Sequence, residues 1–273
     1  MFRTFEISDP ALEFNGLRWV TVSSPALGHR ADLTLFVPPE VAGFTDVPLV
    51  ILLHGVYGSH WAWALKGGAH HVAARLIRGG ILPPVVLAMP SDGLWRDGSG
   101  YVPHVPVVGS PAGSTPDFER WIVEEVPAAV RQGVPEVTER SPRFISGLSM
   151  GGFGALRLAA KHPGWVRAAS GHSSATHADQ LAQFSAGPIS GYSPEAADQS
   201  VLAAMQANRD RLPAIRFDCG VGDFLIEPNR QLHRDLEAAG VAHQYQEFPG
   251  GHTWPYWTEH LEDSLRFFAG HLA

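Results

Sequence analysis

The fold is decided by the stretch Arg143-Phe-Ile-Ser-Gly-Leu-Ser-Met-Gly-Gly-Phe-Gly-Ala-Leu-Arg-Leu-Ala-Ala-Lys-His-Pro163. Its apolar beginning, Phe144-Ile145, predicts a buried strand, and residues 153–160 predict a helix that stops before Pro163. Between them lies a Gly-x-Ser-x-Gly pentapeptide, residues 147–151. The pattern therefore predicts a sharp turn from a strand into a helix, with a serine at the turn.

The residue types around Ser149 suit a nucleophile. To project a hydroxyl from so tight a turn, the backbone at Ser149 must be strained, and a Cβ at Gly147 or Gly151 would collide with it. A helix that starts at Met150 directs its N–H groups and the positive end of its dipole toward an oxyanion at Ser149. In a chain with 29 glycines the pentapeptide also arises by chance, so a base and an acid have to be found elsewhere.

Composition narrows the class of protein. The chain has 273 residues, 45% of them hydrophobic and 17% charged, with a formal net charge of −7. Charges of both signs are scattered, so we predict no nucleic-acid partner and no membrane partner. Cys219 is the single cysteine and falls in an apolar run, which predicts a buried thiol. Acid and proline near the start argue against a signal peptide, so we expect a cytoplasmic protein.

The rest of the chain alternates between strand and helix patterns. Residues 2–37 alternate apolar and polar, which predicts two or three antiparallel strands. Further strands are predicted at Leu49–Leu53, Pro84–Met89, Arg167–Gly171, Ala214–Gly220 and His243–Phe248. Helices are predicted at Trp61–Arg78, Asp117–Gln132 (kinked by Pro127, or limited by it in its last turns), Glu195–Arg211, Glu227–Ala239 and Pro255–Gly270.

This order predicts an α/β fold. The central sheet should be mostly parallel, with antiparallel N-terminal strands and helices on both faces. No linker divides the chain, so residues 1–273 are predicted to form a single domain. Residues 91–116 form a long Gly/Pro/Ser-rich loop. Residues 172–213, irregular up to 194, are a candidate lid or cap insertion.

Three residues that follow predicted strands could form a catalytic triad. In parallel sheets, sites form at the carboxyl ends of strands, where Ser149, Asp223 and His252 are all expected. A serine nucleophile needs a base, and the base needs a carboxylate that fixes its tautomer. The order nucleophile, acid, histidine is the order of the α/β-hydrolase fold.

The acid has two competitors. Asp218 lies inside its strand and would project from a sheet face, whereas Asp223 directly follows the strand. Glu227 is expected in the first turn of a helix, where a carboxylate has an ordinary dipole role. Asp223 is the favoured candidate.

The oxyanion hole is expected to consist of two backbone N–H groups. One belongs to Met150, and the other comes from the glycine-bearing loop after Leu53, with Val56 first and Tyr57 second. Aromatic residues near these loops are predicted to bind substrate: Tyr57, Trp61, Trp95, Tyr101 and Trp254. Trp63 is either core or pocket lining. Glu124-Glu125 is interpreted as a solvated helix face, and no metal or cofactor site is predicted.

Taken together, these motifs resemble the esterase D / antigen 85-type branch of the α/β-hydrolases. The resemblance rests on residues 147–159, on Leu-Leu-His-Gly at 52–55, on Asp-Cys-Gly-x-x-Asp-Phe-Leu at 218–225 and on Pro-Gly-Gly-His-Thr-Trp at 249–254. That branch includes S-formylglutathione hydrolases, feruloyl and acetyl esterases, and mycolyltransferases. The resemblance implies Ser149 as nucleophile, Asp223 as acid and His252 as base. It also implies the N–H groups of Val56 and Met150 as the oxyanion hole. Both assignments agree with those reached above from the residues alone.

The sequence thus predicts a cofactor-independent serine carboxylesterase. Its substrate would be a small-molecule ester with a short-chain or small aromatic acyl group, hydrolysed through an acyl-enzyme. The alternatives are an S-formylglutathione hydrolase-type thioesterase, an acyltransferase of the same fold, and a catalytically silent binding protein. A homo-oligomer is compatible with the sequence.

Overall fold

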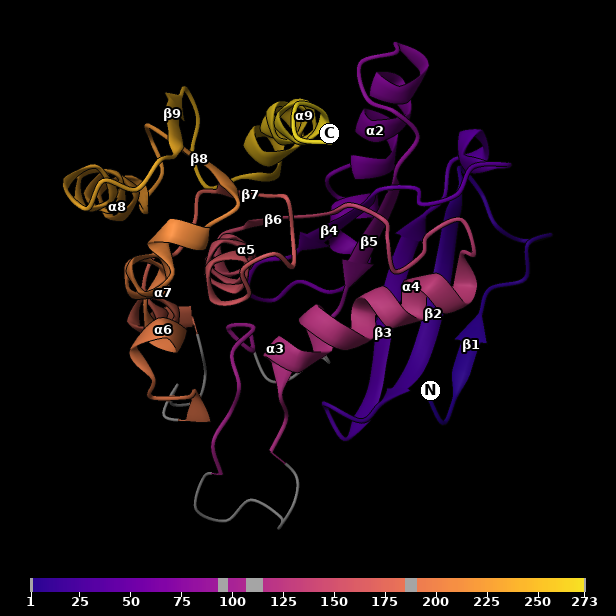
Figure 1. Cartoon of the computed structure of the whole chain (residues 1–273), viewed down its shortest axis with the longest axis horizontal. Coiled ribbons are helices and arrows are strands. Elements are labelled where there is room, and N and C mark those ends of the chain that lie inside the picture. Colours follow the sequence, from indigo (N-terminus) through magenta and orange to yellow (C-terminus); the bar gives the residue numbers. More distant parts are fainter. Residues whose placement is uncertain (1, 93–97, 107–114, 185–190, 273) are drawn as a thin grey trace.

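The computed structural model describes residues 2–92, 98–106, 115–184 and 191–272. Its strands form one nine-stranded sheet in the order β1-β2-β3-β5-β4-β6-β7-β8-β9 (Figure 1). β1, β2, β3 and β5 pair antiparallel, and every neighbouring pair from β5 through β9 is parallel. The predicted α/β-hydrolase sheet, mostly parallel with antiparallel N-terminal strands, is confirmed.

The strands match the predicted runs closely. They are β1 (Phe5–Ile7), β2 (Leu17–Ser24), β3 (His29–Phe36), β4 (Leu49–Leu53), β5 (Val86–Pro90), β6 (Arg143–Leu148), β7 (Ala168–His172), β8 (Ala214–Gly220) and β9 (Gln244–Phe248). The α-helices are α1 (Ala62–Leu65), α2 (Ala69–Arg78), α3 (Phe118–Arg120), α4 (Val126–Gly133), α5 (Met150–Lys161), α6 (Ala196–Gln199), α7 (Val201–Ala207), α8 (Ile226–Ala238) and α9 (Trp254–Ala269). The elements labelled η are short helices of other types: η1 (Pro39–Val41), η3 (Ala178–Phe184) and η5 (Arg209–Arg211) are 3₁₀-helices, and η2 (Trp121–Glu125) is a π-helix.

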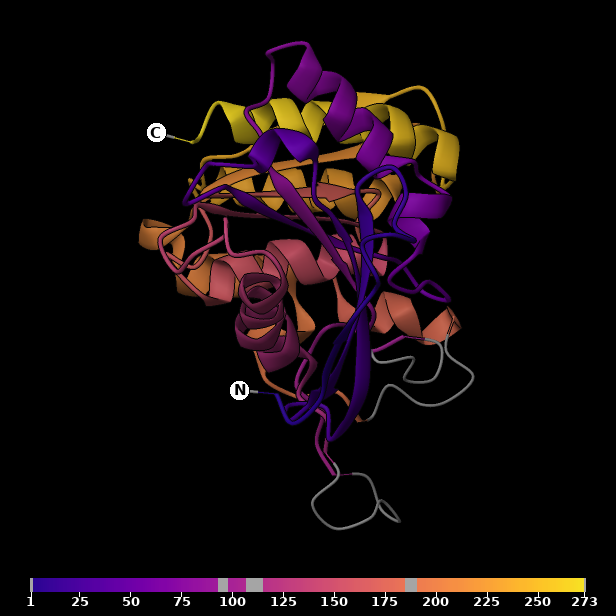
Figure 2. The ribbon, with the colours of Figure 1, turned by 90° about the vertical axis from the view of Figure 1, so that its right-hand side faces the viewer.

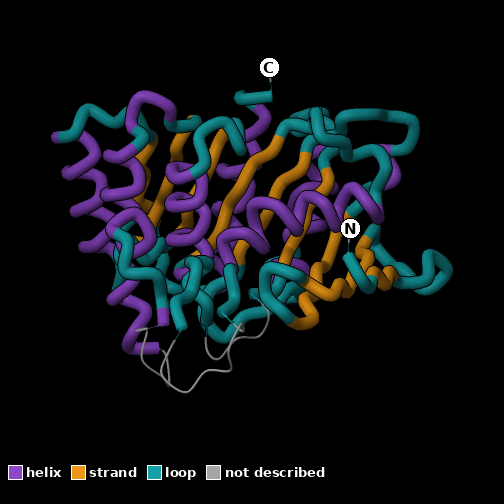
Figure 3. Tube along the Cα trace, turned by 60° about the horizontal axis from the view of Figure 1, so that its bottom comes forward, coloured by secondary structure: helices purple, strands orange, loops and turns teal. Residues whose placement is uncertain are grey.

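Helices cover both faces of the sheet, because its central strands are apolar on both sides. In β4, Val50 and Leu52 pack with α2 and α9, while Leu49, Ile51 and Leu53 pack with α4 and α5 on the opposite face. Figure 2 shows α2 and α9 above the sheet with α4 and α5 below it. Figure 3 shows the strands side by side across the molecule.

Two predicted helices are interrupted. The helix expected over Trp61–Arg78 is two helices, because Gly68 adopts a left-handed φ of 58° and begins a new helix. The helix expected over Glu195–Arg211 breaks at Ser200, whose backbone is extended and whose hydroxyl caps α7 by accepting a hydrogen bond from the N–H of Ala203. In both cases a local conformation outweighs the continuous helical pattern.

Pro127, expected to kink the helix or to limit its last turns, lies within a continuous helical segment. A π-helical turn, η2, joins α3 to α4, which has Pro127 in its first turn. Pro127 has no N–H to donate to the Val123 carbonyl, and the Trp165 indole donates to that carbonyl instead, at 3.0 Å.

The interpretation of Glu124-Glu125 as a solvated face is wrong for its second residue. Glu124 is exposed beside Arg120, but Glu125 is buried and accepts hydrogen bonds from the Ser24 hydroxyl and the Ala26 N–H.

In the described part of the chain, no helix has the length and apolar character that crossing a bilayer requires.

Candidate active site

The turn between β6 and α5 has the strained backbone that the pentapeptide predicts. Ser149 adopts φ 56° and ψ −119°, a conformation that residues other than glycine rarely take. The structure confirms that both positions need glycine. A Cβ there would collide with neighbouring carbonyl oxygens, and not with the backbone of Ser149 as expected. A Cβ at Gly147 would lie 2.2 Å from the carbonyl oxygen of Gly151, and one at Gly151 would lie 2.2 Å from that of Leu53. The elbow therefore requires glycine at both positions.

His252 lies within hydrogen-bond distance of both Ser149 and Asp223. His252 Nδ1 donates to the Asp223 carboxylate, with 2.9 Å to Oδ2 and 3.1 Å to Oδ1. That bond fixes the tautomer and leaves Nε2 to accept from the Ser149 hydroxyl, 3.1 Å away. Such an arrangement can remove the serine proton during nucleophilic attack.

The loops that carry the acid and the base are joined to each other. Beyond the last residues of β8 and β9, the N–H of Gly222 donates to the carbonyl of Gly250 at 2.8 Å. The Leu225 N–H donates to Asp223 Oδ1 at 2.9 Å, which orients the carboxylate. Asp223 is buried, whereas the side chain of His252 is 19% exposed and so can meet a ligand.

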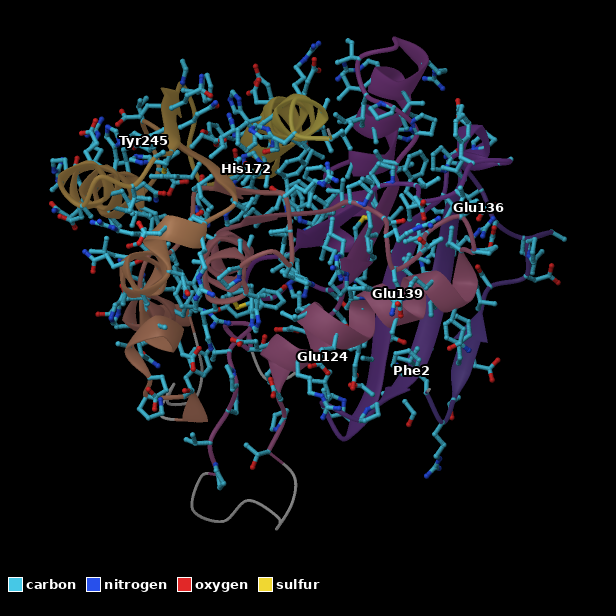
Figure 4. All side chains as sticks on the ribbon, viewed as in Figure 1. Phe2, Glu124, Glu136, Glu139, His172 and Tyr245 are labelled. Atoms are coloured by element: carbon cyan, nitrogen blue, oxygen red, sulfur yellow. The ribbon has the colours of Figure 1, made fainter. Side chains whose placement is uncertain are left out.

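Asp218, the first competitor for the acid, belongs to a separate buried cluster. Its carboxylate lies 2.6 Å from Arg216 Nη1 and 2.9 Å from His172 Nδ1, and the Tyr256 hydroxyl donates to it at 2.8 Å. Burial would raise the pKa of Asp218, but charge and hydrogen bonds from these partners lower it to about 2. Figure 4 labels His172, the last residue of β7, between β8 and α9. Asp218 is thus the carboxylate of a buried ion-pair cluster, separate from the His252 site.

Glu227, the second competitor, lies in the first turn of α8 and pairs with Arg230 at 2.6 Å. It makes no contact with His252 among the interactions of the described residues. Cys219 is buried as predicted, and burial raises the pKa of its thiol. Neither residue belongs to the triad geometry.

The residues predicted to supply the oxyanion hole, Val56 and Met150, are both neighbours of Ser149. Met150 is the first residue of α5, where backbone N–H groups lack intrahelical partners. Val56 lies in the tight turn after β4, in which the Gly58 N–H donates to the Gly55 carbonyl at 3.1 Å. A Cβ at Gly55 would lie 3.3 Å from Cβ of Ser149, so this turn packs directly against the serine.

A cavity of about 310 Å³ opens over the serine. Ser149, His252 and Val56 line it, as do three of the residues predicted to bind substrate: Tyr57, Trp61 and Trp254. Trp95 lies outside the described residues. Trp63, left open between core and pocket, is core: it is buried, and its indole donates to the Leu53 carbonyl at 2.9 Å.

The prediction that Tyr101 binds substrate is corrected. Tyr101 is fully buried and is absent from the cavity lining. Its ring packs on Gly154 of α5, where a Cβ would lie 2.7 Å away, and its hydroxyl donates to the His54 carbonyl at 3.1 Å. Tyr101 therefore connects the helix of the serine to the loop that carries Val56.

The cavity residues that sequence reasoning missed include Lys66, Phe184, Phe224 and Trp257. Phe224 directly follows Asp223, and its ring lies 4.4 Å from that of His252. Its position next to the predicted acid in the sequence could have indicated that it lines the cavity. Phe184 comes from η3, inside the predicted lid segment, and its carbonyl accepts a hydrogen bond from the Tyr57 hydroxyl at 2.6 Å. No pattern in the sequence pointed to Phe184.

Comparisons with known proteins agree on the family. The Esterase family model matches residues 24–268. An acetyl esterase of Caldicellulosiruptor saccharolyticus is 24% identical over 241 residues, covering 82% of this chain and 84% of the relative. An S-formylglutathione hydrolase of Paracoccus denitrificans is 28% identical over 183 residues, covering 65% of this chain and 64% of the relative.

Solved structures share the fold. A ferulic acid esterase superposes with a TM-score of 0.78 at 23% identity, covering 99% of this chain and 100% of its own. An S-formylglutathione hydrolase from Agrobacterium tumefaciens also gives 0.78, at 19% identity, covering 100% and 99%. With the family model matching most of its length, the chain belongs to the Esterase family of α/β-hydrolases and is a carboxylic ester hydrolase.

Proposed function

We propose that the protein is a serine carboxylesterase in which Ser149 attacks the ester carbonyl and His252 accepts its proton. Asp223 holds the histidine tautomer and stabilises the imidazolium that forms. The proposal rests on one observation, the continuous hydrogen bonding from the Ser149 hydroxyl through His252 to Asp223 beneath the cavity.

The reaction proceeds in two halves. Attack by Oγ forms a tetrahedral oxyanion, which accepts hydrogen bonds from the N–H groups of Val56 and Met150. The imidazolium of His252 then protonates the departing alcohol, leaving an ester between the acyl group and Ser149. In the second half, His252 takes a proton from water as the water attacks the acyl-enzyme, and the imidazolium then returns that proton to Ser149 Oγ as the bond to the acyl group breaks and the acid is released.

The cavity suits a small acyl ester. Its aromatic walls, with about 310 Å³ of space, favour short-chain or small aromatic acyl groups over long chains. A panel of p-nitrophenyl esters graded by acyl length tests this preference, and rising kcat/KM toward long chains would contradict it. A fluorophosphonate probe should label the protein, with the adduct located on Ser149 by mass spectrometry. Labelling elsewhere, or none, would refute the assigned nucleophile.

A thioesterase of the S-formylglutathione type is the second candidate. The relative from Paracoccus denitrificans that carries this name favours it, since it is 28% identical. Both candidates use the same triad, so they differ in substrate and not in mechanism. A kcat/KM for S-formylglutathione well above that for simple acetyl esters would support the thioesterase.

A further inference from the structure

Lys66 places a cation in the wall of the cavity that contains Ser149. It follows α1, the short helix after the oxyanion loop, and its side chain is exposed. Its ammonium lies 5.9 Å from the ring centroids of both Trp61 and Trp254, which line the same cavity. The ammonium and both indole rings thus belong to the cavity that contains the candidate nucleophile.

In the part of the chain that the structure describes, no carboxylate pairs with this charge. Among the described residues, none of the ion pairs involves Lys66, and no aspartate or glutamate belongs to the cavity lining. The other lysine of the chain, Lys161, pairs with Glu119 and Asp198 in contrast. Lys66 is therefore available to a charged group of a ligand.

The net charge of the protein makes a local cation more important for binding an anion. With a formal net charge of −7, the protein repels anions at long range, so an anionic ligand needs a local cation to be held. The indole rings of Trp61 and Trp254 keep the ammonium near the cavity, because cations are attracted to aromatic faces. The rest of the lining is mostly apolar or aromatic.

We propose that Lys66 selects esters that carry a second, negatively charged carboxylate, as in half-esters of short dicarboxylic acids or acetyl esters of hydroxy acids. The inference rests on the proposed serine esterase function and adds a substrate class to it. The carboxylate pairs with the Lys66 ammonium while Ser149 attacks the ester carbonyl in the same cavity.

Two pairs of substrates distinguish whether Lys66 recognises a carboxylate on the acyl group or on the alcohol group of the ester. On the acyl side, the p-nitrophenyl half-ester of glutarate is compared with p-nitrophenyl pentanoate, which has the same chain length and no charge. On the alcohol side, the acetyl ester of para-hydroxybenzoate is compared with para-cresyl acetate. For each pair, the ratio of kcat/KM, anionic to neutral, is measured in wild type and variants, so that differences in leaving group cancel.

Lys66→Met should lower the ratio in one of the two pairs by roughly fivefold, the modest size expected of a charge pair near solvent. Lys66→Arg should largely restore the ratio, and Lys66→Glu should lower it further. About 0.5 M NaCl should weaken the wild-type preference by screening. Arg234→Gln removes one positive charge from the exposed face of α8, outside the cavity, and should leave both ratios unchanged.

The inference is overturned if Lys66→Met leaves both ratios within about twofold of wild type, or if Arg234→Gln lowers them equally. The esterase proposal fails separately, when the neutral esters show no turnover that depends on Ser149. In that event calorimetric binding of glutarate decides: binding that Lys66→Met weakens supports the inference, and binding that is absent or unaffected overturns it.

Discussion

Asp218 and Asp223 are five residues apart in and after one strand, and the same substitution should affect them in opposite ways. In Asp223→Asn, the side-chain oxygen can still accept from the Leu225 N–H, so we expect a loss of stability below about 1 kcal/mol. The amide, however, no longer fixes the His252 tautomer. We expect kcat to fall by about 10⁴-fold, as wrong-tautomer variants of serine enzymes do.

Asp218→Asn should instead damage the fold. Asp218 is fully buried and Arg216 is 2% exposed, so the substitution removes the nearer carboxylate of a buried guanidinium and leaves it only Asp263, which is 3.8 Å away and 40% exposed. Removing one partner of a buried ion pair typically costs about 3–5 kcal/mol. Whatever fraction remains folded should keep its turnover, because Asp218 makes no contact with His252 among the described interactions.

Two assays on each variant separate these effects. Urea unfolding gives the change in free energy of unfolding, and p-nitrophenyl acetate hydrolysis gives kcat per folded molecule. The reasoning would be refuted by a stable Asp218→Asn that had lost its turnover together with an Asp223→Asn that had kept it. That pair of results would make Asp218 the acid.

Three further outcomes are expected. Tyr101→Phe removes the donor to the buried His54 carbonyl and should cost about 1–2 kcal/mol of stability and lower kcat, whereas a rise in KM alone would restore Tyr101 as a substrate contact. Gly147→Ala should fail to fold or lose probe labelling, since its Cβ would lie 2.2 Å from the Gly151 carbonyl oxygen; circular dichroism and labelling check this. Burial lowers the pKa of His70 from 6.5 to about 4, so protonation favours the unfolded chain and stability falls as the pH drops below 6.5. Between pH 7 and about pH 5 this loss should reach about 2 kcal/mol, and urea unfolding of His70→Leu should show a pH dependence weaker by that amount.

Much of the fold could be predicted because each strand of the parallel sheet is a short apolar run between turn residues. Ala214–Gly220 has the predicted bounds, and the helix after Ser149 begins at the predicted Met150. The helix break at Gly68 could not be predicted in the same way. A glycine within a helical pattern is compatible with a continuous helix, and only packing decides whether it takes a left-handed conformation.

The candidate site divides along similar lines. The geometry of Ser149, Asp223 and His252 follows from their places after β6, β8 and β9, whose carboxyl ends lie at the same edge of the parallel sheet. The walls of the cavity come from separate segments, so their meeting depends on tertiary packing. Tyr101 shows the difference: its loop position favoured a surface role, but the absence of a side chain at Gly154 makes room for its ring in the core.

The most direct test of the proposed mechanism is the kcat/KM of Ser149→Ala for p-nitrophenyl acetate, measured beside its unfolding midpoint in urea. The substitution removes only Oγ, and the elbow is held by the glycines around it. We predict a loss of about 10⁶-fold, as found when a serine nucleophile is deleted, with a nearly unchanged unfolding midpoint. Near-wild-type turnover by a folded Ser149→Ala would contradict the account.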